Sequence, residues 1–103
     1  MALPSAPAWD TAESCIWFEI AYKAHTILCR IDALCLQKSF GSTAMSEGAC
    51  RVALRDQWPR IHAMALSQAE AGHLESQPSL MRRFVWLTEK SFAQRVVVAP
   101  ATG

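Results

Sequence analysis

Cysteine and histidine are the residues of this chain best suited to metal binding or nucleophilic chemistry, but their spacing fits neither role. The closest grouping, His25-x3-Cys29-x5-Cys35, matches no zinc motif, and no two cysteines form a Cys-x-x-Cys pair. Free cysteines are among the most buried residues and act as small apolar side chains. We therefore expect no metal, no structural disulfide and buried, reduced thiols. The cysteines are Cys15, Cys29, Cys35 and Cys50.

The sequence motifs of common enzymes are also missing. Serine, histidine and aspartate all occur, yet the chain has no nucleophile elbow, no phosphate-binding glycine loop and no H-E-x-x-H pair. His62 and His73 fall on a predicted helix, where we expect exposed side chains. We therefore expect a protein without enzymatic activity and without a cofactor.

A basic and aromatic group of residues could bind single-stranded nucleic acid. Arg51 and Arg55 are one turn apart on a predicted helix, while Arg82 and Arg83 precede a predicted strand that carries Trp86. Arginines would contact phosphates, and the ring would stack on a base. However, acidic residues dilute this group and the net charge is only +1, so a solvated surface is the simpler interpretation.

Two stretches of alternating polarity predict a β-hairpin that positions another candidate surface. Residues 16–22 and 25–31 both place every second apolar side chain on one face. If Lys23 and Ala24 form a two-residue turn, antiparallel pairing brings inward residues opposite one another. The predicted pairs are Ile16 with Ile31, Phe18 with Cys29, and Ile20 with Ile27.

The opposite face of this hairpin is the predicted interaction surface. Trp17 would lie across from Arg30, as in a cation–π pair, with Leu28 beside them. No predicted helix covers this apolar area, so the segment at Trp9, the tail at Val97, a second copy or a protein partner must cover it. Coverage by the protein's own tail is the favoured alternative.

Cap residues and apolar spacing predict two helices. Asp32 would cap a short helix over residues 33–40 that ends at Gly41. Ser46 would cap a long helix whose apolar seam runs from residue 50 to residue 72. The seam runs unbroken through Pro59, but a proline inside a helix removes a hydrogen bond, so we expect a kink between residues 55 and 59 or a break into two collinear helices.

These elements predict an α+β fold of order β-β-α-α-β. Residues 83–88 supply a third strand, and the antiparallel sheet packs against a short helix and a long kinked helix. Residues 95–99 would form a fourth, edge strand or an ordered tail. The predicted domain organisation is a flexible lead-in over 1–8, a single domain over 9–94 and a tail or edge strand over 95–103.

Length and composition agree with one globular domain. The chain has 103 residues, of which 51% are hydrophobic and 18% are charged. Its first residues lack the basic start and apolar run of a secretion signal, and no apolar stretch reaches the length of a membrane span. We therefore expect a cytoplasmic location and no membrane contact.

The order and spacing of several positions are similar to those of a known bacterial family. They are Trp9-Asp10, Ile16-x-Phe18, Cys29-x-Ile31, Phe40-Gly41, Leu54, Ile61-x3-Ala65, the strand Phe84 to Thr88, and Phe92. This pattern resembles the family numbered 1488 among the domains of unknown function, over roughly residues 9–93. The resemblance implies a small α+β fold with an antiparallel sheet on two helices, and it implies no activity.

Two positions depart from the family pattern. Lys23-Ala24 stands where the hairpin turn would have Asp-Gly or a similar pair, and Trp58 stands where a basic residue is expected one turn before Ile61. The sequence as a whole predicts a protein-interaction or regulatory module, with self-association as one form of that interaction. The alternative is a nucleic-acid-binding accessory protein that uses Arg82, Arg83 and Trp86.

Overall fold

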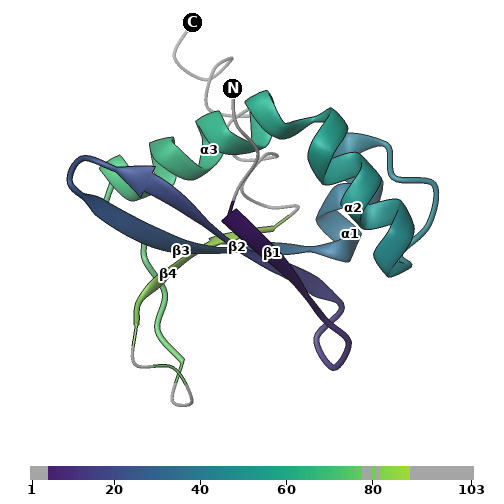
Figure 1. Ribbon diagram of the computed structural model, residues 1–103, viewed down its shortest axis with the longest axis horizontal. Helices are drawn as coiled ribbons and strands as arrows, with labels where there is room; N and C mark the ends of the chain where they lie inside the picture. Colours follow the sequence, from purple (N-terminus) through teal and green to yellow (C-terminus); the bar gives the residue numbers. More distant parts are fainter. Residues whose placement is uncertain (1–4, 78–79, 81, 89–103) are drawn as a thin grey trace, which may run out of the picture.

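A computed structural model describes residues 5–77, 80 and 82–88, which form a four-stranded sheet and three helices (Figure 1). The fold is α+β, as predicted, and its order is β-β-β-α-α-α-β. The elements are β1 (Ser5–Asp10), β2 (Cys15–Tyr22), β3 (His25–Asp32), α1 (Ala33–Phe40), α2 (Glu47–Asp56), α3 (Trp58–Glu70) and β4 (Phe84–Leu87). In this part of the chain, no helix has both the length and the apolar composition needed to cross a membrane.

The central hairpin has the predicted register. β2 and β3 pair along their whole length, so that Ile16 lies opposite Ile31 and Phe18 lies opposite Cys29. The turn has two residues, and Lys23 takes the left-handed conformation with a φ of 55°. A side chain at this angle is less favourable than glycine, but the matched apolar pairs along both strands fix the register.

The sheet is mixed, so the prediction of an antiparallel sheet is wrong in one pairing. β4 runs parallel to β3, with Phe84 beside Leu28 and Leu87 beside Ile31. β3 continues directly into α1, and α3 then carries the chain back over the sheet (Figure 1). A strand that begins after such a crossover runs in the direction of β3.

The fourth strand of the sheet is N-terminal. Residues 5–8, expected to belong to a flexible lead-in, form β1 together with Trp9 and Asp10 and pair with β2. Proline is tolerated on an edge strand, and the carbonyl of Pro7 accepts a hydrogen bond of 3.0 Å from Arg51 Nη1 on α2. The predicted edge strand over 95–99 lies outside the described residues.

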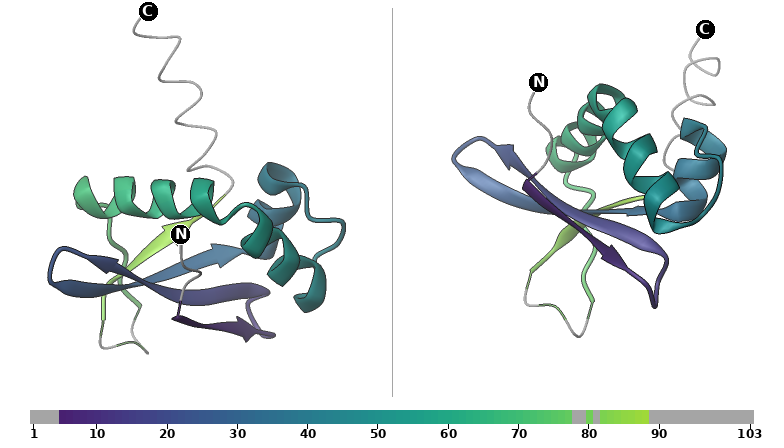
Figure 2. Two further views of the ribbon diagram at one scale, coloured as in Figure 1. Left: turned by 45° about the horizontal axis from the view of Figure 1, so that its top comes forward. Right: turned by 45° about the vertical axis from the view of Figure 1, so that its right-hand side comes forward.

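The predicted long helix is two helices. Gln57 separates α2 from α3, and Pro59 occupies the first turn of α3, where a missing amide costs least. The break is therefore confirmed, but the two helices are not collinear, because α2 turns away from the axis of α3 (Figure 2). Ser46 caps α2 as predicted, since its hydroxyl accepts a bond from the Ala49 amide at 3.4 Å.

The main core lies between the helices and one face of the sheet. Phe18 packs its edge against Trp58, with ring centroids 5.4 Å apart, and both residues are buried. All four cysteines are buried free thiols, as the sequence predicts. The helices thus cover one face of the sheet. The face turned away from them is here called the outer face.

Candidate functional site

Three strands each place one side chain in a line across the outer face. Trp17 of β2 pairs with Arg30 of β3, and Arg30 pairs with Trp86 of β4. Because side chains alternate between the faces of a sheet, these three residues point away from the main core. We call Trp17, Arg30 and Trp86 the outer row.

The guanidinium of Arg30 lies between the two indole rings. Its Cζ is 4.3 Å from the ring centroid of Trp86 and 5.7 Å from that of Trp17. Arg30 is only 7% exposed, and a charge so far from water needs partners. Its Nε donates to Asp32 at 3.0 Å, and its Nη2 lies 4.0 Å from Glu13. The cation therefore fixes the spacing of both rings.

Asp32 holds this arrangement together. It stands at the N-cap position of α1, but its side chain makes no capping hydrogen bond, so the prediction that it caps this helix is wrong. Both of its carboxylate oxygens lie 3.1 Å from the indole Nε1 of Trp86, and one of them also accepts the bond from Arg30. The carboxylate is turned to the outer row, where it pairs with the cation of Arg30 and accepts from the indole of Trp86. The first amide of α1, on Ala33, donates instead to the carbonyl of Ser14 at 2.9 Å.

Asp10 fixes the other end of the row. The indole Nε1 of Trp17 donates to Asp10 at 3.2 Å, and the backbone amide of Glu13 donates to the same carboxylate at 3.1 Å. The bonds from Glu13 and then Trp17 hold the pKa of Asp10 below its ordinary value, so this carboxylate remains charged at neutral pH. Phe84 packs edge-on against Trp17 with ring centroids 5.1 Å apart.

Trp86 is the member of the row that faces solvent most. It is 37% exposed, while Trp17 and the neighbouring Leu28 are half-buried and Phe84 is buried. The predicted surface of Trp17, Leu28 and Arg30 is thus present on one face, and β4 adds Trp86 to it. Val97, the remaining residue of the predicted surface, lies outside the described residues, so coverage by the tail stays a prediction.

The predicted nucleic-acid group is divided between two sides of the molecule. Arg51 and Arg55 lie on α2, where Arg51 contacts Glu47 at 2.9 Å and Arg55 contacts Asp56 at 3.3 Å. On the outer face, Arg82 contacts Glu19 at 2.7 Å. Arg83 donates to the carbonyl of Leu74 at 3.2 Å. These arginines therefore form no continuous basic surface.

The cysteines and histidines form no reactive group among residues 5–77, 80 and 82–88. Burial raises the pKa of Cys15 to about 11 and that of Cys29 to about 12, so both remain protonated thiols at neutral pH. His62 packs against the Trp58 ring, with centroids 5.1 Å apart. The described residues also contain no cluster of His, Cys, Asp and Glu that could hold a metal ion.

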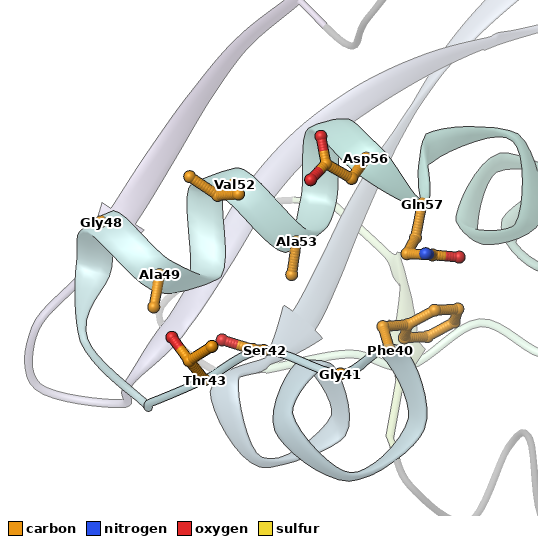
Figure 3. Close-up of a pocket in the computed structure, with 10 residues that line it drawn as sticks. All are labelled: Phe40, Gly41, Ser42, Thr43, Gly48, Ala49, Val52, Ala53, Asp56 and Gln57. Atoms are coloured by element: carbon orange, nitrogen blue, oxygen red, sulfur yellow. The ribbon is translucent and has the colours of Figure 1, made fainter.

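A groove of about 660 Å³ lies between the end of α1 and the side of α2 (Figure 3). Its wall on α2 consists mainly of small side chains, and Figure 3 shows Thr43 pointing toward that helix. The Ser42 hydroxyl already donates to the Ala44 carbonyl at 2.6 Å, and Asp56 is the single titratable group in the lining. The lining of this groove therefore lacks the pair of titratable groups that acid–base or nucleophilic catalysis would need. The lining residues are Phe40, Gly41, Ser42, Thr43, Gly48, Ala49, Val52, Ala53, Asp56 and Gln57.

From the sequence, Trp17 and Arg30 were assigned to the interaction surface and Trp86 to the nucleic-acid group. The two carboxylates that hold the row, Asp10 and Asp32, were not assigned to either. Asp32 follows the period of two that places Arg30 outward, and this spacing was the available signal for it. Asp10 reaches the row through the pairing of β1 with β2, which the sequence did not predict. The position of Trp86 was not available from the sequence, because it depends on the parallel pairing of β4.

Comparisons with known proteins identify the family of this chain. No curated protein and no solved structure matches it. The family described as "Protein of unknown function (DUF1488)" matches residues 3–81, which include β1, the hairpin and all three helices, but not β4. The match starts earlier and ends earlier than the predicted resemblance over 9–93. The chain belongs to the DUF1488 family, a family of unknown function.

Proposed function

We propose that this protein is a non-enzymatic interaction module that binds another polypeptide through the outer face of its sheet. The observation that carries this proposal is the state of Trp86, which is 37% exposed and held by Arg30 and Asp32. A rigid, partly exposed tryptophan loses little entropy on binding, and tryptophan is among the residues that contribute most to protein interfaces.

The chemistry of the remaining side chains supports a role without catalysis. The thiols of Cys15 and Cys29 have raised pKa values and are buried, which makes them poor nucleophiles. Every buried side-chain nitrogen and oxygen among the described residues has a hydrogen-bond partner, so none is held ready for a substrate.

The outer face is a poorer match for nucleic acid. Arg82 already contacts Glu19, and Arg83 already donates to a backbone carbonyl. Four carboxylates lie on or beside the outer face, and they would repel a phosphate backbone. They are Asp10, Glu13, Glu19 and Asp32. Nucleic acid is therefore the second candidate, and the following experiment separates the two.

Photo-crosslinking from two exposed positions tests the proposal in the living cell. The photoreactive residue p-benzoylphenylalanine replaces Trp86 in one variant and Leu34, which is 43% exposed on α1, in a matched control. We expect a defined protein adduct from position 86 and none from position 34. Equal adducts from both positions, or no adduct from position 86, would contradict the proposal. An adduct of position 86 with nucleic acid would favour the alternative.

A further inference from the structure

The outer face has a charge opposite to that of the whole chain. Four carboxylates and two guanidinium groups lie on or beside it, so its formal charge is −2, whereas the net charge of the protein is +1. The acidic residues are Asp10, Glu13, Glu19 and Asp32, and the basic residues are Arg30 and Arg82.

The exposed charges of this face are mainly carboxylates. The Arg30 side chain is 9% exposed, and its charge is enclosed by rings and carboxylates. The Glu13 side chain, by contrast, is 59% exposed, and that of Glu19 is 38% exposed. An approaching molecule therefore meets the carboxylates of Glu13 and Glu19 and the guanidinium of Arg82, which is 47% exposed and paired with Glu19, whereas Arg30 is hidden from it. The exposed ring of Trp86 lies on the same face, beside the carboxylate of Asp32.

We infer that the partner of the outer face is a cationic polypeptide segment, with lysine or arginine side chains on either side of an apolar residue that packs on Trp86. This inference rests on the proposed function and adds the chemical class of the partner. Opposite charges speed association and select the partner, whereas like charges disfavour the wrong one. The same charge disfavours two copies of this chain meeting face to face.

Two synthetic peptides of opposite charge test the inference. The first is acetyl-Gly-Lys-Leu-Lys-Leu-Lys-Gly-amide, and the second has glutamate in place of each lysine. Each is titrated into the full-length, 15N-labelled protein. We expect the lysine peptide to shift the indole resonance of Trp86 and the amide resonances of β3 and β4, and its binding to weaken with added salt. The glutamate peptide should leave these resonances unchanged.

A pair of charge-reversal variants separates a local effect from the effect of net charge. Glu13→Lys changes an exposed residue beside the outer row, and Glu70→Lys makes the same change at the end of α3, in the helical layer. We expect Glu13→Lys to weaken the binding of the lysine peptide about three- to tenfold, because solvent partly screens the interaction between exposed charges. Glu70→Lys should have little effect on this affinity.

Three results would overturn the inference. These are equal binding of both peptides, an equal loss of affinity in the two variants, and no resonance shift with either peptide at millimolar concentration. Failure of the inference differs from failure of the proposed function. If position 86 still crosslinks to a protein while the peptides show no charge preference, the interaction module stands and only the cationic partner is wrong.

Discussion

Arg30 is the residue that gives the outer face its fixed shape. It stacks between Trp17 and Trp86 and bonds to Asp32, so that one side chain links three strands. Cation–π contacts contribute ~2 kcal/mol when the cation is removed from water, and loss of one partner of a buried ion pair leaves the other charge uncompensated. The cross-strand pair of Trp17 and Arg30 was predictable from the hairpin register, but the second ring was not.

Arg30→Met therefore tests the outer row as a structural unit. The substitution keeps an apolar stem but removes the charge, and we expect the free energy of unfolding in urea to fall by about 2 kcal/mol. The Trp86 indole resonance should broaden or shift because its neighbour is lost. The control is Arg55→Met, at a side chain that is 61% exposed, where we expect a change within about 0.5 kcal/mol. Equal losses in the two variants would contradict this role of Arg30.

At the scale of the elements, the sequence predicts those whose signal is local. The alternation of apolar residues in β2 and β3 determines their register, and Pro59 accounts for the break at Gln57. The orientation of β4 depends on the point at which the three helices bring the chain back to the sheet. No local sequence pattern predicts that point. β1 was missed because its proline and alanine residues have low strand propensity, and its pairing depends on β2 and on Arg51.

Arg51 is expected to couple α2 to the edge strand β1. It bonds to both Glu47 and the Pro7 carbonyl, so Arg51→Ala removes a link between the helical layer and the sheet. We expect a loss of about 1 kcal/mol, the typical contribution of one such hydrogen bond, and faster amide hydrogen exchange in β1 than in β3. Arg55→Ala on the same helix is the control. If β1 exchanges at the same rate in both variants, Arg51 does not hold this strand.

The whole molecule is a two-layer domain with a clear difference between its two sides. Helices cover one face of the sheet (Figure 1). The other face carries an acidic surface with a partly exposed tryptophan. The family match covers residues 3–81 and therefore omits β4, which carries Trp86. The proposed contact residue thus lies outside the segment that identifies the family.

The affinity of the partner captured at position 86 is the measurement that tests the central claim most directly. Isothermal titration compares the unmodified protein with Trp86→Ala, Trp86→Phe and the exposed control Leu34→Ala, after urea unfolding has shown that each variant is folded. We predict that Trp86→Ala weakens binding about thirtyfold, which corresponds to the ~2 kcal/mol of an interface hot spot. Trp86→Phe should have a smaller effect and Leu34→Ala almost none. An unchanged affinity in folded Trp86→Ala would contradict the proposal that the outer face binds the partner through this ring.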